Sequence, residues 1–258
     1  MNEEFRRHIA ACNNFILPAD RQALSIGTTQ VGWLEPRIAA ELLAMGAVSA
    51  VDDGLVLGDP ICLPALAHDL AMRGFYRFRG EAFDVRARPG APVLTTIDRG
   101  ALPAFGIMAE GVHLNGLVHR ADGLHLWVAR RAADKALDPG KLDHLVAGGV
   151  SAGMTPWETL IKESAEEATI PEYLAKQAIK TGALHYTMLR EEGLRRDFLH
   201  CYDVVLPEDF MPLAADGEVE SFELWPIARV FDTVRRTDDF KFNVSLVLID
   251  LFERLGLA

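Results

Sequence analysis

The chain has 258 residues, of which 50% are hydrophobic and 24% are charged, a composition typical of a globular protein. This length allows one large domain or two modest ones. The formal net charge of −11 disfavours binding to a nucleic-acid polymer, which requires a basic surface. It does not exclude a phosphorylated small molecule, because a metal ion can neutralise phosphate charge locally.

The three cysteines, Cys12, Cys62 and Cys201, are far apart and include no C-x-x-C pair. This usage predicts reduced, buried thiols in a cytoplasmic protein rather than a disulfide framework or a zinc site. The charged N-terminus lacks a long apolar core, so we expect no signal peptide. No apolar run approaches the length that crosses a bilayer, and we therefore expect no membrane partner.

The first part of the chain predicts a mixture of helices and strands and contains no motif with readable chemistry. Leu102-Pro103 and the residues that follow indicate a boundary near 103–111, and we expect residues 1–105 to form an N-terminal α+β domain. Hydrophobic periodicity and turn dipeptides place its elements. Helices are expected at 2–15, 36–45 and 63–73, extended segments at 23–33, 75–85 and 93–97, and a hairpin at 48–57.

The remaining residues, 106–258, predict a second domain. Asp122-Gly123 between two runs rich in strand formers predicts a hairpin. Strands on both sides of one central helix, with a helix that closes the chain, predict a mixed α/β sandwich. Its strands are expected at 112–119, 124–131, 183–189, 197–206 and 219–226, and its helices at 156–168, 172–181, 227–235 and 243–255.

The central helix carries the most informative residues. A glycine-rich loop leads into it, Thr155 is a suitable N-cap, and Glu158 completes a capping box. Glu163, Glu166 and Glu167 follow at i, i+3 and i+4, so their carboxylates share one face. Like charges at this spacing repel, and a hard divalent cation such as Mg²⁺ would reverse the sign of that interaction. The alternative is an ordinary solvated acidic face.

This stretch resembles the Nudix box, a loop Gly, five residues, Glu, seven residues and R-E-(aliphatic)-x-E-E-x-G on a helix. Gly148 takes the loop position, and the three glutamates stand at the helical positions of the family. The resemblance implies a Nudix-type α/β/α sandwich with a mixed sheet. The departures from the pattern are Met154 for the upstream Glu, Lys162 for Arg, Ser164 for an aliphatic residue and Thr169 for Gly.

Further stretches resemble a Nudix subfamily with an extra N-terminal domain, which includes thiamine-diphosphate-related hydrolases of plants and fungi. In that subfamily Lys usually replaces the Arg of the box. The resemblance also implies that residues 1–105 are the extra N-terminal domain of the subfamily. The stretches are 126–131, Lys135, 139–143, 147–149, 162–163, 166–168, 216–220 and 241–243.

The resemblance implies roles for individual residues. Glu163, Glu166 and Glu167 would ligate Mg²⁺, or Mn²⁺ in its place, and Lys162 would orient a glutamate. The general base is open between a box glutamate and a distant one. The remaining candidates are a backbone carbonyl of Gly148-Gly149 as a further metal ligand, with a plain tight turn as the alternative, Glu218 and Glu220 for the base, and Lys135, Lys141 and Lys241 for substrate phosphate.

Other polar and aromatic residues give weaker indications. Ser151 lacks the context of a nucleophile elbow, so serine hydrolysis is not expected. The tryptophans could stack on a heteroaromatic ring, but core packing is the default for each. The histidines have no metal-ligand spacing, and His185 and His200, in expected strands, are expected to be structural. These residues are Trp33, Trp127, Trp157 and Trp225, and His113, His119, His125, His144, His185 and His200.

The expected function is Mg²⁺-dependent hydrolysis of a diphosphate bond in a small phosphorylated metabolite. The subfamily implies thiamine diphosphate or a damaged analogue as substrate. The alternatives are a nucleoside diphosphate, including an oxidised one, a non-catalytic sensor of a phosphorylated metabolite, and an isomerase. Residues 1–105 either cover the active site or mediate a homodimer, and the sequence leaves both open.

Overall fold

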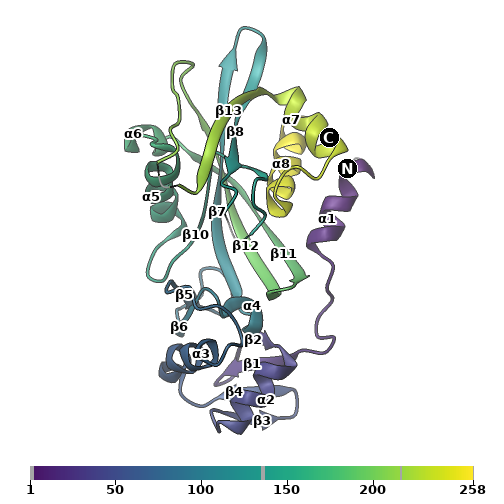
Figure 1. Ribbon diagram of the computed structural model, residues 1–258, viewed down its shortest axis with the longest axis vertical. Helices are drawn as coiled ribbons and strands as arrows, with labels where there is room; N and C mark the ends of the chain where they lie inside the picture. Colours follow the sequence, from purple (N-terminus) through teal and green to yellow (C-terminus); the bar gives the residue numbers. More distant parts are fainter. Residues whose placement is uncertain (1–2, 135–136, 216, 258) are drawn as a thin grey trace.

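The computed structural model describes residues 3–134, 137–215 and 217–257. Figure 1 shows a smaller part at the bottom, built from the first hundred or so residues, and a larger part above it. The long strand β7 (Met108–Arg120) begins beside the smaller part and runs up into the larger one. Within the described residues, no helix combines the length and the apolar character needed to cross a bilayer.

The smaller part is built around a four-stranded sheet in the order β2-β1-β4-β3. Strand β1 pairs antiparallel with β2 and parallel with β4, so the sheet is mixed. One buried apolar cluster extends from Leu24 to Ile107 and joins this sheet to its helices. The elements are β1 (Gln22–Ile26), β2 (Thr29–Leu34), α2 (Pro36–Ala44), β3 (Val48–Val51), β4 (Gly54–Leu57), α3 (Leu63–Met72), β5 (Ala82–Val85), β6 (Thr95–Asp98) and α4 (Leu102–Phe105).

The larger part contains a seven-stranded sheet whose main path is β11-β12-β7-β8-β13. Strand β12 pairs parallel with β7, whereas β7 and β8 form the antiparallel hairpin expected at Asp122-Gly123. The sheet is therefore mixed, as the sequence predicted. The strands other than β7 are β8 (Gly123–Arg131), β9 (Leu142–Asp143), β10 (Val146–Gly149), β11 (Ile179–Arg190), β12 (Gly193–Val205) and β13 (Val219–Pro226).

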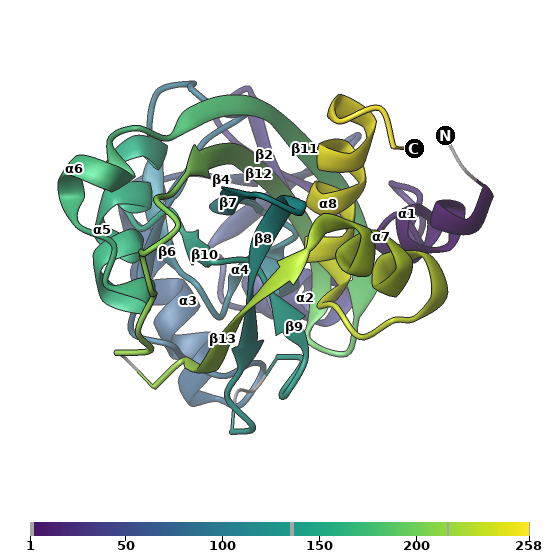
Figure 2. The same cartoon turned by 90° about the horizontal axis from the view of Figure 1, so that it is seen from above.

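Helices cover both faces of this sheet, which confirms the α/β/α sandwich (Figure 2). One apolar cluster joins α5 (Pro156–Ala168) and α6 (Glu172–Ala175) to one face. A second cluster joins α7 (Ile227–Arg236) and α8 (Phe242–Arg254) to the other. Alternate residues of a strand point to opposite faces, so Trp225 packs towards α7 and α8 while Leu224 packs towards α5.

Among the predicted elements that are shorter than the sequence indicated are the strand at 75–85 and the helix at 172–181. The strand expected at 75–85 is reduced to β5, because the Asp98 carboxylate accepts hydrogen bonds from the backbone N–H groups of residues 79, 80 and 81. Those groups are held in a loop and cannot join a strand ladder. The helix expected at 172–181 ends at Ala175, and the chain enters β11 at Ile179.

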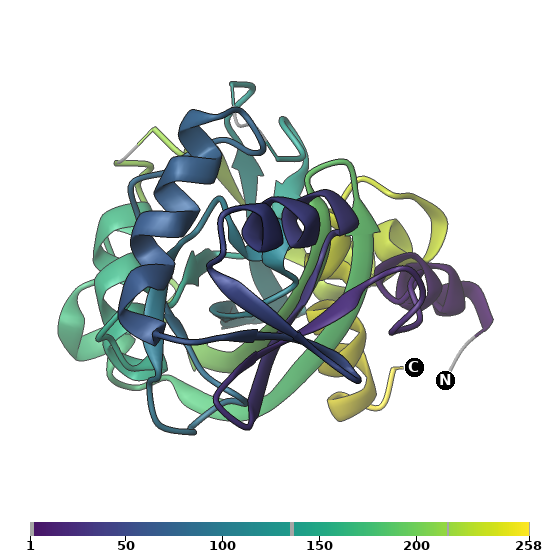
Figure 3. The same ribbon diagram turned by 90° about the horizontal axis from the view of Figure 1, so that it is seen from below.

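The first helix, α1 (Arg6–Cys12), lies beside the last helices of the chain rather than on the small sheet (Figure 3). Phe5 is fully buried against Phe231 and Phe252, with ring centroids 5.3 Å and 6.0 Å away. The Arg7 guanidinium donates to the carbonyl oxygens of residues 234, 235 and 237. The division of the chain at residue 105 stays a prediction, and this segment contributes to the core of the larger part.

We predict that Phe5→Ala lowers the free energy of unfolding by about 3–5 kcal/mol, the usual cost of removing a buried aromatic ring. Urea denaturation monitored by circular dichroism measures the change. Ile16→Ala is the control, because Ile16 is 86% exposed and its truncation is expected to cost under about 0.5 kcal/mol. Equal, small effects of the two substitutions would contradict the packing of Phe5 in the core.

Candidate functional site

The acidic helix α5 begins and ends at well-defined residues. The capping box predicted from the sequence is present: the Glu158 N–H donates to Thr155 Oγ1 at 3.2 Å, and the Thr155 N–H donates to Glu158 Oε2 at 2.8 Å. The helix ends at Thr169, which adopts φ 51° in the left-handed region. Glycine usually fills such a position because it has no Cβ. Thr169 therefore accepts some backbone strain at the place where the Nudix box has Gly.

Lys162 connects two of the three glutamates. Its ammonium group lies 3.0 Å from Glu163 Oε1 and 2.7 Å from Glu166 Oε2. The hydrogen bond to Glu166 is the main reason that the pKa of Lys162 is raised. Burial opposes this shift, and the hydrogen bond to Glu163 adds to it. A lysine thus orients both carboxylates, although its ammonium lacks the planar fork with which an arginine would fix their geometry.

Glu163 lies against the backbone of the glycine loop. A methyl group added at Gly148 would come within 2.4 Å of Glu163 Cγ, so only glycine allows strand β10 to approach the helix this closely. Burial raises the pKa of Glu163, and the hydrogen bond and charge of Lys162 oppose that shift. The backbone of Gly148 therefore lies close to Glu163, and its role as a metal ligand stays a prediction.

Glu167 is the most buried of the three, with 7% of its surface exposed. The Ala147 N–H donates to its Oε2 at 2.9 Å. Burial raises the pKa of Glu167 well above its usual range, and the negative charges of Glu163, Asp143 and Glu218 add to the shift. The Ala147 hydrogen bond acts in the opposite direction without cancelling the shift, so the charge of this carboxylate is incompletely compensated.

Glu218 lines the same small cavity as Glu167. The cavity has a volume of about 10 Å³, and its wall includes Ala147 and Val219. A cavity of this size holds at most about one water molecule. The structure thus brings Glu218, which directly precedes β13, to the acidic end of α5. Glu220, on that strand, does not line the cavity, and both residues are exposed.

The lysines predicted to meet substrate phosphate lie in different places. Lys241 is nearly buried and forms an ion pair with Asp143 at 3.5 Å. Lys141 donates to the Asp238 carbonyl oxygen, away from α5. Lys135 lies outside the described residues. Among the tryptophans, Trp127 and Trp225 are buried in the cores and Trp157, beside Tyr202, is partly exposed.

A buried cluster behind the site was not predicted. Arg131 Nη1 lies 2.7 Å from Asp143 Oδ2, and Lys241 Nζ lies 3.5 Å from the same oxygen. Burial by itself would raise the pKa of Asp143, but Lys241 and Arg131 outweigh it and hold that pKa well below its usual range. This carboxylate is therefore ionised and fully compensated.

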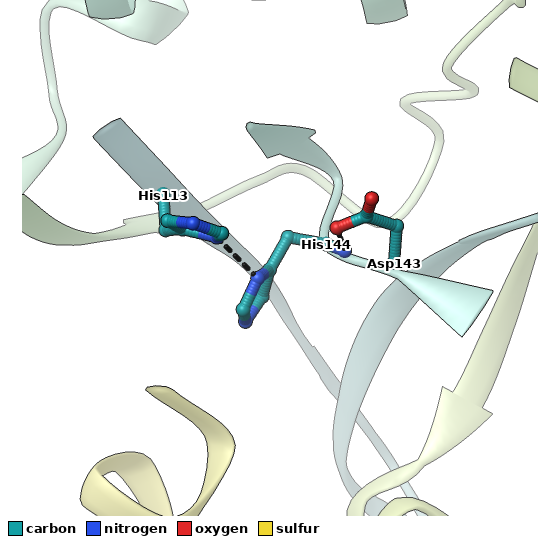
Figure 4. Close-up of side chains that lie close together, drawn as sticks. All are labelled: His113, Asp143 and His144. Atoms are coloured by element: carbon teal, nitrogen blue, oxygen red, sulfur yellow. Dashed lines mark hydrogen bonds between the residues drawn. The ribbon is translucent and has the colours of Figure 1, made fainter. Parts of the chain in front are cut away.

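Two histidines accompany Asp143 (Figure 4). His113 Nδ1 and His144 Nδ1 are 2.8 Å apart, so one ring donates to the other. Burial lowers the pKa of His113 strongly and that of His144 to about 4, which keeps both rings neutral at pH 7. One ligand atom from each of the three residues lies within 4.8 Å of the others. The two fixed cations on Asp143 make this a poor place for a metal ion compared with the acidic face of α5.

The N-terminal part holds the loop that leads into α5. Ser151 Oγ donates to Glu81 Oε1 at 2.8 Å, and the Ala152 N–H donates to the Ala82 carbonyl oxygen at 2.7 Å. The Phe83 ring lies directly over Gly149, where an added methyl group would be 2.6 Å from its Cζ. These hydrogen bonds fix the loop. They could not be predicted from the sequence, because Glu81 and Ala82 are far from the loop along the chain.

Comparison with known proteins agrees with this geometry. A family model described as the NUDIX domain matches residues 112–244. Two Arabidopsis thaliana proteins are similar. Nudix hydrolase 20, chloroplastic, is 42% identical over 201 residues, which are 78% of this chain and 50% of that protein. Nudix hydrolase 24, chloroplastic, is 45% identical over 179 residues, 69% and 49% of the two chains. The chain thus spans about half the length of these curated relatives.

A solved structure shows the same fold. The crystal structure of DR0079 from Deinococcus radiodurans superposes with a TM-score of 0.52 at 19% identity and covers 66% of this chain and 98% of its own. At this identity the likeness concerns the fold alone.

We predict that Gly149→Ala destabilises the protein by about 1–3 kcal/mol, because the new methyl group would clash with the buried Phe83 ring. Urea denaturation measures the effect. Gly182→Ala is the matched control, since no atom of the described residues outside its immediate neighbours would lie within 4 Å of that methyl group. If the two variants were equally stable, the contact between Phe83 and the loop would not constrain the fold.

The raised pKa of Glu167 predicts a pH-dependent stability in the presence of EDTA. An acid whose pKa is raised on folding stabilises the native state below its ordinary value of 4.5, and this stability is lost as the pH rises through the folded-state pKa. Glu167→Gln should therefore be more stable than the wild type at pH 8, with a difference that shrinks towards pH 4. Thermal unfolding across this range measures it. Glu172→Gln, on the exposed helix α6, should not gain stability at high pH.

Proposed function

This chain belongs to the NUDIX domain family, and on that premise we propose that it is a divalent-metal-dependent hydrolase of diphosphate bonds in small phosphorylated metabolites. In the proposed reaction, water attacks a phosphorus atom, the bridging P–O bond breaks, and a monophosphate and inorganic phosphate leave. The activity and substrate are proposals, since the named relatives are about twice as long as the matched segment.

The observation that carries this proposal is the meeting of two carboxylates of α5 with the backbone of strand β10, and the lysine that joins a third carboxylate to them. Glu163 lies against Gly148, Glu167 accepts from Ala147, and Lys162 joins Glu163 to Glu166. An isolated acidic helix face would need none of these contacts. They favour a built site over a solvated surface.

The donor set fits a hard divalent cation. Carboxylate oxygens are the ligands that Mg²⁺ and Mn²⁺ prefer, and among the described residues no side-chain cation forms an ion pair with Glu167. Glu163, Glu166 and Glu167 would hold the metal. When bound, it would neutralise phosphoryl charge and lower the pKa of water. Met154, at the position of the upstream Glu of the box, offers no ligand for such an ion.

Residues of the chain itself would position the reaction. Lys162 sets the side chains of Glu163 and Glu166, and the Ala147 N–H fixes Glu167. Glu218 is our candidate for the general base, because it shares a cavity with Glu167 and its carboxylate could accept a proton from the attacking water. Glu220 is the less favoured candidate because it does not line this cavity.

The finer assignment concerns the substrate. The resemblance to the subfamily with an extra N-terminal domain supports thiamine diphosphate or a damaged analogue, and oxidised nucleoside diphosphates are the alternative. We expect no nucleic-acid polymer as partner, given the charge of −11. We place the protein in the cytoplasm because its three cysteines are free thiols, and we note that the names of the two plant relatives describe those proteins as chloroplastic.

We predict phosphate release from one member of a panel of thiamine diphosphate, its oxidised analogues, ADP and 8-oxo-dGDP, only when Mg²⁺ or Mn²⁺ is present. Glu166→Gln and Glu167→Gln should each lower kcat by about 100-fold or more, because each removes a metal ligand. A colorimetric phosphate assay measures the release. Glu172→Gln, which removes an exposed carboxylate of α6, should retain full activity.

Two outcomes would contradict the hydrolase. Binding of a panel member without phosphate release would indicate a sensor, and conversion without phosphate release would indicate an isomerase. Phosphate release that persists in EDTA, or in Glu166→Gln and Glu167→Gln, would show that the acidic helix takes no part in the reaction.

A further inference from the structure

A larger cavity lies on the opposite face of the sheet from α5. It has a volume of about 430 Å³, within the range typical of small-molecule sites. We call it the α7 pocket. The side chains that matter for its chemistry are Arg130, Lys141, Trp225, Arg229, Thr233 and Asp239.

The α7 pocket is cationic in a protein of net charge −11. Arg130, Lys141 and Arg229 contribute positive charge, and Asp239 contributes the one negative charge of its lining. Arg130 Nη1 donates to the Gly140 carbonyl oxygen at 3.0 Å, and Lys141 donates to the Asp238 carbonyl oxygen. Within the described ranges, neither Arg130 nor Lys141 forms an ion pair with a carboxylate, so most of their donor capacity is available to an anion.

The third cation is held in a fixed orientation. The Arg229 guanidinium lies over the buried Trp225 ring, with its Cζ 3.6 Å from the ring centroid. Its ion pair with Glu223 is long, at 3.9 Å, and solvent-exposed. A guanidinium is planar, and stacking on the ring leaves its N–H edge free to donate to the oxygens of a phosphate group.

The α7 pocket is distinct from the acidic face of α5. Arg130 and Arg131 are neighbours on β8 and therefore point in opposite directions. Arg131 binds Asp143 beside the acidic site, whereas Arg130 lines the α7 pocket. Trp225 likewise belongs to the apolar cluster of α7 and α8, not to that of α5.

We propose that the α7 pocket binds the phosphate group of a small molecule without the help of a divalent metal. The three cations supply the charge and the N–H donors, and the pocket is large enough for a phosphate with an organic group attached. This inference does not depend on the hydrolase proposed above. The ligand would be a phosphorylated compound separate from the hydrolysed substrate, because the α7 pocket and the acidic face of α5 lie on opposite faces of the sheet.

Inorganic pyrophosphate in EDTA is the probe, and isothermal titration calorimetry on the full chain measures its binding. Arg130→Gln and Lys141→Gln should each weaken binding by at least about 10-fold, since each removes charge-assisted hydrogen bonds. Lys176→Gln is the matched control: it removes one positive charge from an exposed ion pair on the other side of the sheet and should leave binding unchanged.

Asp239→Asn should tighten binding several-fold, because it removes the one negative charge from the lining; misfolding could not produce this result. Absence of binding to the wild type, or equal affinities of the wild type and Arg130→Gln, would overturn the proposal. The same variants test whether the pocket is separate from the hydrolase site. Unchanged KM and kcat in Lys141→Gln would support a separate ligand, and a raised KM would show that the pocket belongs to the substrate site instead.

Discussion

The close approach of strand β10 to helix α5 is the constraint on which the candidate site depends. Gly148 has no side chain, so Glu163 can lie on the backbone of the strand, and one residue earlier the Ala147 N–H reaches Glu167. A larger residue at Gly148 would push the helix away and open both contacts. The glycine thus sets the distance between the acidic face and the sheet, and the capping box at Thr155 sets where the helix begins.

The N-terminal part extends this constraint. Strand β5 lies along the loop between β10 and α5, where Phe83 covers Gly149 and Glu81 holds Ser151. Glu81 is itself paired with Arg99 at 2.8 Å, so the anchor of the loop is tied into the smaller part. The first segment of the chain also contacts the larger part, because Phe5 completes the core beneath α7 and α8. Both contacts join residues on either side of the boundary predicted at residue 105.

The sequence predicted the features that depend on neighbouring residues. The capping box, the Asp122-Gly123 hairpin and the shared face of Glu163 and Glu167 each follow from local spacing and are present. The cluster of His113 with Asp143 was not predicted, because its members come from β7 and β9 and meet only after the sheet has formed. Asp98 likewise shortened a predicted strand through bonds to residues 18 and 19 positions earlier. In both cases the structure differs from the prediction because of interactions between residues far apart in the chain, and not because a local propensity was misjudged.

The compensation of buried charge distinguishes the two carboxylates nearest the site. Asp143 and Glu167 are equally buried, yet Asp143 has two cationic partners, Arg131 and Lys241, whereas among the described residues Glu167 has a single backbone N–H. An uncompensated buried carboxylate is costly, and a fold that needed only packing at this position would place an apolar residue there. The cations on Asp143 are fixed, so that carboxylate requires no positive ion from solution to balance its charge. Glu167, with Glu163 and Glu218 adding to its negative potential, is the place in this fold where a positive charge from outside the chain would gain most.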